Sequence, residues 1–488
     1  MAKRVAVIDI GSNSLRMVIY EKTSRFAFHI LHEAKSKVRI SEHAYKNGGN
    51  LQPLPMKRAY DALENFLTII SSFKARKTLC VATSALRDAP NKKEFLNHVK
   101  NSLGLNIKII DGQREAYLGA IACANLLPAQ EKALSIDIGG GSTEFSIINK
   151  KNIDANISLN LGTVRLKELF FDSNDIEGAK KYIDLQLSQL DGIDVSKIIG
   201  IGGTFRAISY AILDNSGYPL DKLHAYEPSY DEFHSLLTKI LDSDEESLKK
   251  LGIKNSRFDV IKPGALILLR VFKKFKIREL ITSGVGVREG TFLADLLRTS
   301  RDKFPEGYNT SVRYILDAHV DNQAHANQIN RVAKELFDIM HKELNIDEKY
   351  RHELAIAAKL CMSGSTIHYY SYNKHSYELI EDALEFGFTH KQIVLIATLA
   401  RFSKRKLPSS SHVERLKPLL PDTNQLNALS YILSLSVALL SHQPRNVDFK
   451  LSFENSELKI ESNNSLFLAK ENIAKIETLK NNIKLSFL

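Results

Sequence analysis

The chain has 488 residues, of which 44% are hydrophobic and 25% are charged. This composition is typical of a folded protein of several domains, and it excludes a disordered or fibrous chain. The formal net charge is +11, and a basic chain favours polyanionic partners such as nucleic acid, nucleotides, polyphosphate or an anionic membrane.

The three cysteines, Cys80, Cys123 and Cys361, lie far apart in the sequence. An odd number without metal-ligand spacing predicts neither a disulfide framework nor a zinc site, so we expect reduced thiols and a cytoplasmic protein. The most apolar later stretch, Tyr431–Leu440, is shorter than the roughly 20 residues that a membrane span needs. We therefore expect no membrane partner.

Short apolar strands alternate with longer helical patterns over the first 300 residues, and this alternation predicts a mixed α/β architecture. The predicted strands are residues 5–10, 17–20, 79–82, 107–110, 134–138, 144–148, 198–201 and 279–283. The predicted helices are residues 56–75, 92–103, 114–125, 176–190, 204–213, 230–241, 261–275 and 289–297.

The second part of the chain has a different pattern. Its apolar spacing is almost entirely helical, for example at residues 330–343, 350–360, 376–385 and 391–401. Strand-like segments then return at residues 447–453, 457–462 and 483–487. From these changes we predict four domains, at residues 1–125, 126–300, 301–445 and 446–488.

One segment of the first half is repeated about one domain length later. The residues Val5–Ser14, with the sequence VAVIDIGSNS, are echoed by Ala133–Ser142, with the sequence ALSIDIGGGS. In both copies an apolar strand ends in Asp-Ile-Gly, enters a turn of small residues and is followed by a second strand. This pattern predicts a β-hairpin with a small-residue loop rather than a strand-to-helix phosphate loop.

Each of these turns leaves backbone N–H groups available to an anion, because glycine permits close approach and a positive φ. Hydroxyl and amide side chains in the turns add further hydrogen-bond donors. A single turn is weak evidence, since such hairpins are common. Two copies, each preceded by Asp, predict two facing domains that hold one phosphate chain; the alternative is two ordinary hairpins in a duplicated fold.

Three acids stand beside the repeated turns. Asp9 and Asp137 come shortly before the glycines, and Glu144 lies just beyond the second turn. Mg²⁺ prefers one or two carboxylates together with water and substrate phosphate, so we predict these three residues as ligands of Mg²⁺, with Mn²⁺ as the alternative metal. The alternative role for each acid is to accept hydrogen bonds from loop amides.

Two further glycine turns follow predicted strands, at Gly200–Thr204 and Ser283–Gly290. The first leads into a helix that begins Phe205-Arg206-Ala207, and amides at a helix N-terminus favour an anion or a nucleotide. Each turn is a weak signal alone, whereas four turns after strands form a strong one.

The chain resembles the exopolyphosphatase / guanosine pentaphosphate phosphohydrolase family, which belongs to the sugar kinase–Hsp70–actin fold superfamily. The segments that carry the resemblance are Ile8–Ser14 with Arg16, Ala82–Ala89, Ile136–Glu144 and Gly202–Thr204. The resemblance implies an α/β fold of two duplicated actin/ribonuclease H-like domains. An all-helical HD-like domain and a small α+β C-terminal domain would follow them.

The resemblance also implies a reaction in which water attacks the terminal phosphoryl group of inorganic polyphosphate or of guanosine pentaphosphate (pppGpp) and releases orthophosphate. In this family a glutamate activates the water, and Glu115 matches it within Ile109–Gly119. Without the resemblance, Glu115 is an acid that the helix dipole favours. Arg16, Arg87 and Arg257 match positions that bind phosphate oxygens, and solvated surface arginines are the alternative.

The predicted phosphate-binding residues come from the four turns and these arginines. They are Gly11, Ser12, Asn13, Ser14, Arg16, Arg87, Gly139, Gly140, Gly141, Ser142, Thr143, Gly202, Gly203, Thr204 and Arg257.

The helical part resembles an HD-type domain, whose helices normally present a His and an adjacent His-Asp pair to a metal. Cys361 and Met362 stand where His and Asp are expected, and Ser365 replaces a further His. Because Met is not a ligand for a hard metal, we predict no second catalytic centre here. The histidines that remain, expected to be structural or to contact anions, are His325, His368 and His375.

Two basic stretches, Asn373–Ser376 and Arg401–Lys406, match those of the family. The second would offer a path for a long anionic chain, and a solvated helix end is its alternative. The resemblance further implies a homodimer formed through the helical domains. We expect inorganic polyphosphate and guanosine penta- or tetraphosphate as ligands, and no specific nucleic acid.

Two other functions stay open at this point. A sugar or acetate kinase on the same fold would need a phosphoryl acceptor and a catalytic Asp in the second domain. A non-catalytic polyanion-binding regulator would account for the basic charge and the degenerate HD motif. Release of phosphate from polyphosphate without any acceptor separates both from the hydrolase.

Overall fold

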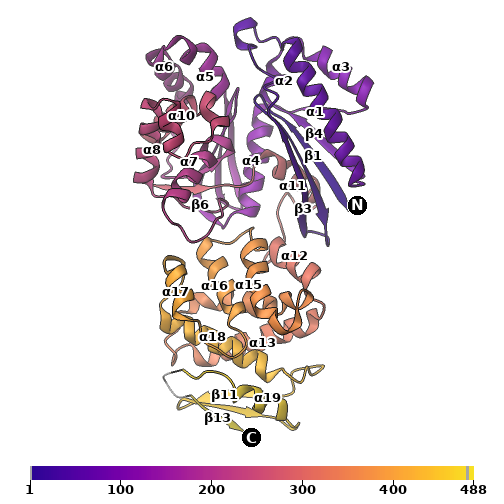
Figure 1. Cartoon of the computed structure of the whole chain (residues 1–488), viewed down its shortest axis with the longest axis vertical. Coiled ribbons are helices and arrows are strands. Elements are labelled where there is room, and N and C mark those ends of the chain that lie inside the picture. The colour runs from indigo at the N-terminus through magenta and orange to yellow at the C-terminus, as the bar shows by residue number, and fades with distance from the viewer. Residues whose placement is uncertain (1–2, 480–482) are drawn as a thin grey trace. The chain divides into compact units, whose positions relative to one another are not determined.

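The computed structural model describes residues 3–479 and 483–488. The first two residues of the predicted domain 1–125 and residues 480–482 of the predicted domain 446–488 lie outside the described residues. The chain divides into two compact units, Met1–Tyr308 and Asn309–Leu488 (Figure 1).

The first sheet of unit 1 has the strand order β3-β2-β1-β4-β5. Strands β1 and β2 form an antiparallel hairpin, whereas β4 runs parallel to β1 and β5 runs parallel to β4. Five apolar residues of β1 are almost completely buried, which places this strand at the centre of the lobe. The strands are β1 (Arg4–Ile10), β2 (Leu15–Lys22), β3 (Phe28–Ser36), β4 (Lys77–Ala82) and β5 (Lys108–Ile109).

The second sheet repeats this topology, with the strand order β10-β9-β6-β7-β8. Strands β6 and β7 form the equivalent antiparallel hairpin, and β9 runs parallel to β6 in the place of β4. The predicted duplication of an α/β fold is therefore confirmed. The strands are β6 (Gln130–Ile138), β7 (Thr143–Lys150), β8 (Asn152–Leu159), β9 (Lys197–Ile201) and β10 (Glu279–Thr282).

Helices cover both sheets, and two of them join the lobes (Figure 1). Helix α4 (Gly112–Leu126) packs against β7, β8 and helix α11 (Val287–Leu296), and α11 in turn packs on β1. The stacked rings of Tyr20 and Phe292, 4.2 Å apart, fix α11 on the first sheet. A helix that follows the first sheet in sequence thus lies on the second.

The other helices of unit 1 flank the two sheets, and two separate apolar cores lie beneath them. They are α1 (Pro53–Ser72), α2 (Ser84–Asp88), α3 (Lys92–Leu103), α5 (Thr163–Leu169), α6 (Ile176–Leu187), α7 (Gly202–Asn215), α8 (Tyr230–Asp242), α9 (Glu245–Lys250) and α10 (Phe258–Phe275), with the 3₁₀ turns η1 (Tyr45–Asn47), η2 (Phe171–Ser173), η3 (Ser188–Leu190) and η4 (Asn255–Arg257).

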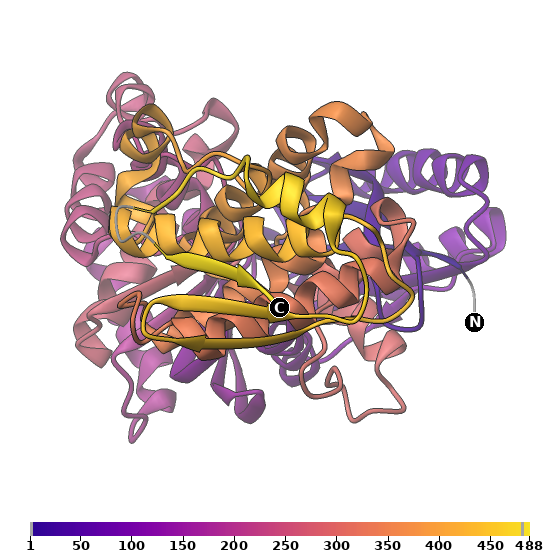
Figure 2. The same ribbon diagram turned by 90° about the horizontal axis from the view of Figure 1, so that it is seen from below.

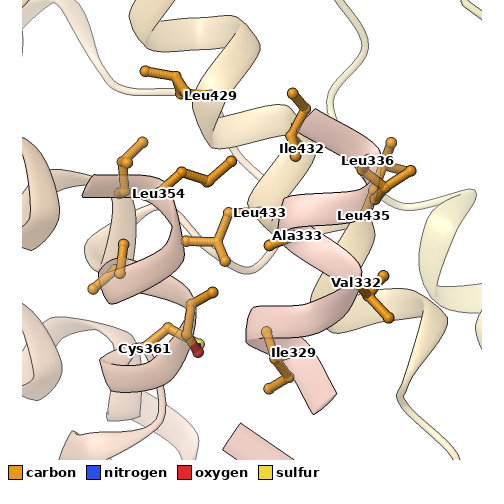
Figure 3. Packing of buried hydrophobic residues seen from close by; sticks show 14 of the residues in the cluster. Ile329, Val332, Ala333, Leu336, Leu354, Cys361, Leu429, Ile432, Leu433 and Leu435 are labelled. Carbon is orange, nitrogen blue, oxygen red and sulfur yellow. The ribbon is translucent and has the colours of Figure 1, made fainter. Parts of the chain in front are cut away.

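Unit 2 is a helical domain around one core, as the sequence predicts. Figure 3 shows apolar side chains of α13, α14 and α18 pointing toward one another, with the thiol of Cys361 among them. The helices are α12 (Thr310–His319), α13 (Gln323–Met340), α14 (Arg351–Leu360), α15 (Tyr372–Ala383), α16 (His390–Arg401), α17 (Ser410–Leu416) and α18 (Thr423–Leu439), with the 3₁₀ turns η5 (Glu348–Tyr350), η6 (Ser363–Thr366), η7 (Tyr369–Ser371) and η8 (Lys417–Leu419).

A small sheet closes the chain (Figure 2). Its strands β11 (Lys450–Glu454), β12 (Glu457–Glu461) and β13 (Lys484–Phe487) follow the order β11-β12-β13, and helix α19 (Phe467–Ile473) packs on α18. The predicted α+β character of the tail is confirmed. Among the described residues, no helix combines the length and the apolar character that a membrane crossing requires.

The sequence analysis missed two strands, β3 and β8. Both are edge strands, and both carry polar residues where the pattern expects apolar ones, such as Glu33 and Lys35 in β3 and Asp154 in β8. An edge strand is exposed along one side and therefore tolerates charge, which removes the alternation that marks a buried strand.

Candidate active site

The two repeated hairpins have the same loop geometry. The amide of Gly11 donates to the carbonyl of Ser14 (3.3 Å), and the amide of Gly139 donates to the carbonyl of Ser142 (2.9 Å). Each loop therefore spans four residues and is closed by an equivalent hydrogen bond. The predicted hairpins are confirmed, and both loops line a single cleft in unit 1.

The tips of the two loops touch each other. A Cβ added to Gly140 would lie 2.7 Å from Cβ of Ser12, which is closer than two carbons can approach. A Cβ added to Gly141 would collide with the hydroxyl of Tyr45 and would lie 2.8 Å from Oγ of Ser84. Glycine in the second loop is therefore required by the close approach of the first lobe.

These loops offer donors to an anion. In the described part of the chain, the amides of Ser12, Asn13 and Gly140 have no hydrogen-bond acceptor, and all three residues line the cleft. Unpaired backbone N–H groups that gather at one cleft form a nest for phosphate oxygens. The hydroxyl of Ser12 bonds to that of Ser84 (3.1 Å), so it is already oriented by the first lobe.

Helix N-termini add to this end of the cleft. Helix α7 begins at Gly202, and Gly202, Gly203 and Thr204 all line the cleft. Gly202 has a φ of +81°, and a Cβ there would collide with Oδ1 of Asp137. The first turn of α7 thus directs its partial positive charge at the cleft while lying against the carboxylate.

Four arginines line the cleft, and the sequence analysis assigned only Arg16 and Arg257 to it. Arg206 lies in the first turn of α7 and donates to the carbonyls of Gly202 (3.0 Å) and Gly284 (2.9 Å). Arg288 lies in the first turn of α11 and donates to Glu33 (2.6 Å). Both follow glycine turns that the sequence analysis had singled out, so an arginine just inside such a helix was the available signal.

The cations of the cleft lie close enough to lower one another's pKa. Burial lowers the pKa of Arg206 to about 10, and the neighbouring Arg16 and Arg288 add to this effect. Lys35 lies beside Arg16 in the next strand, and burial together with Arg16 and Arg257 lowers the pKa of Lys35 to about 8. Cations crowded in this way favour a multiply charged anion between them.

The cleft also holds buried carboxyls, and Asp9 and Asp137 lie among its arginines. Burial raises the pKa of Asp9 to about 6, against the lowering effect of Arg288 and Arg16. Burial also raises the pKa of Asp137, and it raises the pKa of Glu144 to about 7. Carboxyls whose pKa is raised by burial are typical of sites that bind a cation or move a proton.

Glu115 lines the same cleft and lies near Glu144. It belongs to the first turn of α4, which Asp111 caps by accepting from the amide of Arg114 (2.7 Å). Its Oε2 accepts from Nη1 of Arg87 (2.9 Å), and the residue is 8% exposed. Burial and the nearby Glu144 hold the pKa of Glu115 well above its usual range, while Arg87 opposes them.

Most of the predicted site residues line the cleft. Four do not, and all four have other partners. Arg87 binds Glu115, and its Nη2 donates to Oγ of Ser142 (3.5 Å). Thr143 is fully buried, and its hydroxyl donates to the carbonyl of Leu161. The predicted residues outside the lining are Arg87, Gly141, Ser142 and Thr143, whereas Thr83, Ser84, Arg206, Arg288 and Glu289 line the cleft without having been assigned to it.

The acids fit a divalent cation only in part. Oδ1 of Asp9 is buried and, in the described part of the chain, has no hydrogen-bond partner, so a cation would satisfy it. Oε1 of Glu144 already accepts from Ser158 (2.8 Å). Within the described residues no three acids converge as a ready-made metal cage. One or two carboxylates with water and phosphate would suffice for Mg²⁺.

Two repeated α/β lobes with matching glycine hairpins at a shared cleft define the actin-like fold class. Residues 3–299 match the Ppx/GppA phosphatase family, and residues 309–482 match domain III of the same phosphatases. The chain therefore belongs to the Ppx/GppA phosphatase family.

Individual proteins agree with this assignment. The chain is 26% identical over 474 residues to a guanosine-5'-triphosphate,3'-diphosphate pyrophosphatase of Photobacterium profundum, and the match covers 93% of this chain and 90% of that protein. A crystal structure of the Aquifex aeolicus family member is 29% identical (TM-score 0.53), covering 61% of this chain and 99% of that one. That of an exopolyphosphatase from Cytophaga hutchinsonii is 26% identical (TM-score 0.56), covering 60% and 97%.

Proposed function

We propose that the protein is a phosphoanhydride hydrolase that releases terminal orthophosphate from inorganic polyphosphate, from pppGpp or from both. The observation that supports this most is the set of groups in the cleft that both hairpins line. Four arginines and free loop amides line it together with buried carboxyls, and two of these carboxyls, Asp9 and Asp137, lie among the arginines. A chain of phosphates is an anion that needs both a long cationic cradle and a site for water at its end.

In this proposal the arginines and the loop amides of the cleft bind and align the phosphate chain. Arg16 and Arg257 contact phosphate oxygens from the two lobes, and a Cβ on Gly203 would collide with the guanidinium of Arg257, so that arginine lies against the first turn of α7. Phosphoryl transfer depends on in-line alignment and on neutralised charge more than on covalent chemistry. The hairpin amides supply that neutralisation without any rearrangement.

Glu115 acts as the general base. It orients water toward the terminal phosphorus and accepts a proton at the carboxylate oxygen that Arg87 does not hold. Its raised pKa supports this role, because burial makes the carboxylate a stronger proton acceptor than an exposed glutamate. Arg87 keeps part of the population ionised and fixes the rotamer of the carboxylate.

Asp9 and Asp137 would hold Mg²⁺, or Mn²⁺ in its place, and Glu144 would stand beside it. When bound, the cation neutralises phosphate oxygens and offsets the mutual repulsion of these buried acids. Asp137 also lies directly against Gly202, where a Cβ would collide with its carboxylate.

Relatives carry names for both substrates: a guanosine-5'-triphosphate,3'-diphosphate pyrophosphatase and an exopolyphosphatase. The choice between them, and the homodimer that the family resemblance implies, stay predictions for this chain. A cytoplasmic location is likewise a prediction.

Side-by-side kinetics on polyphosphate, pppGpp and ATP test the proposed function. We expect Mg²⁺-dependent release of phosphate from polyphosphate or pppGpp with no acceptor present, and a much slower reaction with ATP. Phosphate that appears only when a sugar or acetate acceptor is added would establish a kinase instead. Tight binding of polyphosphate without any release would establish a non-catalytic binding protein.

A further inference from the structure

A second cavity lies in unit 2, and the proposed hydrolysis does not use it. It encloses about 420 Å³, which is within the size range of small-molecule sites. Its walls come from α13, from residues 362–372, from the segment after α16 and from the end of α18. All of these belong to the same compact unit.

The cavity occupies the place of the degenerate HD motif. Met362 and His325 line it, whereas Cys361 is fully buried and its thiol donates to the carbonyl of Ala358 (3.4 Å). None of the described residues that line the cavity is Asp or Glu. A site without carboxylates does not suit a hard cation.

Two adjacent cations line the cavity without a counter-charge. Nζ of Lys404 donates to the carbonyl of Tyr370 (2.7 Å) and lies 4.3 Å from the ring centroid of Tyr372. In the described part of the chain, neither Lys404 nor Arg405 lies within 4.0 Å of a carboxylate. Burial and the neighbouring Arg405 lower the pKa of Lys404, which shows that the charge is uncompensated.

Two buried polar atoms also lack partners. Nδ1 of His325 and Oγ of Ser441 are inaccessible to solvent and, within the residues that the structure describes, form no hydrogen bond. Both residues line the cavity. Buried polar atoms are nearly always paired in folded proteins, so these two atoms beside the cavity are exceptions.

The remaining walls fit the uncharged part of an organic ligand. Leu440, Val437 and Met362 provide an apolar surface, and Tyr369 presents its ring with 67% exposure. An inorganic anion would gain nothing from these side chains, whereas a planar base would stack on the tyrosine. We propose that this cavity is a binding site for a nucleoside phosphate, with its phosphate at Lys404 and Arg405 and its base toward Tyr369.

The sequence contains no tryptophan, so Tyr369→Trp provides a single fluorescent reporter at the cavity. We would titrate the full-length variant with GMP and AMP, using inorganic phosphate and tripolyphosphate as comparison ligands. Monophosphates contain no phosphoanhydride bond, so the result does not depend on the proposed hydrolysis. We expect a saturable change in fluorescence with a Kd below about 1 mM for at least one nucleotide.

Charge reversal supplies the specific test. Lys404→Glu/Arg405→Glu in the reporter background is expected to weaken nucleotide binding by at least about tenfold. The matched control is Arg331→Glu/Lys342→Glu, which reverses two exposed charges of the same unit outside the cavity and is expected to change Kd by less than about twofold. If circular dichroism shows that the double reversal unfolds, Ser441→Val replaces it and is expected to weaken binding in the same direction.

Three results would overturn the proposal. The first is the absence of any saturable change with either nucleotide. The second is binding of inorganic phosphate or tripolyphosphate as tight as that of the nucleotides, which would define an inorganic anion site. The third is a loss of binding in the control variant that equals the loss in the cavity variant.

Discussion

The two hairpins of unit 1 have the same strand pairing, and one of the differences between them is the cross-strand pair beside the loop. In the first hairpin Asp9 is paired across the strands with Arg16, and in the second hairpin Asp137 is paired with Glu144. The same register therefore presents a cation beside the first loop and a second acid beside the other. The two hairpins therefore contribute different charges to the one cleft that both of them line.

The loops differ for a second reason, which is contact between the lobes. The first loop has serine and asparagine side chains, whereas the second has three glycines. Gly140 and Gly141 lie against Ser12, Tyr45 and Ser84 of the first lobe, so side chains there would separate the lobes. The comparison shows that the composition of a phosphate loop is also set by the surface that faces it.

The largest effect is expected with Glu115→Gln. Removing a general base lowers kcat by about 10²–10⁴-fold, while KM is expected to change little because the arginines of the cleft are intact. Steady-state phosphate release from polyphosphate and pppGpp measures both constants. Glu94→Gln, an acid-to-amide change on the exposed face of α3, is the matched control. A kcat within about threefold of the wild type would remove Glu115 from the mechanism.

The paired positions are expected to respond differently. Arg16→Gln removes a charged donor to phosphate, so we expect KM to rise by about 10–100-fold, from the roughly 1.5–3 kcal/mol that such hydrogen bonds contribute. Glu144→Gln is expected to lower kcat instead, because it removes the acid beside Glu115. Equal effects of the two variants on KM, with kcat unchanged in both, would show that Arg16 and Glu144 do not have these separate roles.

Contact between the loops is tested by Gly140→Ala. The added Cβ would lie 2.7 Å from Ser12, so the loops must separate, and we expect kcat/KM to fall by about tenfold or more. Gly119→Ala is the control, because its Cβ would make an ordinary contact of 3.5 Å with Ile201. Unchanged kinetics in Gly140→Ala would mean that the two loops do not act on one ligand.

The smallest effect concerns stability. The pKa of Glu144 is raised from 4.5 to about 7, so the folded protein binds more protons than the unfolded chain between these pH values. The free energy of unfolding therefore falls as the pH rises from about 4.5 to 7. In the absence of metal, Glu144→Gln is expected to raise Tm at pH 8 by on the order of 5 °C and to flatten this pH dependence. A variant that melts lower than the wild type at pH 8 would contradict the raised pKa.

Much of this arrangement could be predicted from the sequence because its signals are local. The Asp-Ile-Gly repeats mark the hairpins, and the apolar runs mark central strands such as β1 and β6. Arg206 and Arg288 were not predicted as site residues, because they reach the cleft only through the convergence of α7 and α11. The partners of Arg87 and Thr143 likewise depend on distant contacts that no local pattern encodes.

The cavity of unit 2 could not be predicted from the sequence as a whole. From the sequence, Met362 replaces a ligand of a metal motif and His325 is expected to be structural or to contact anions, and the structure places both at one cavity. The other walls come from Lys404, Ser441 and Asn472, which are far apart in sequence. The degenerate motif thus predicts the loss of metal ligands, whereas the residues that surround the cavity are brought together only by the fold.

The most direct test of the shared cleft is a titration of inactive Glu115→Gln protein, labelled with ¹⁵N in glycine and serine, with tripolyphosphate. The amide signals of Ser12 and Gly140 report on the two hairpins separately. We expect both signals to shift along a single binding curve with one Kd. Movement of one signal alone, or two Kd values that differ by more than about threefold, would contradict one phosphate chain held by both lobes.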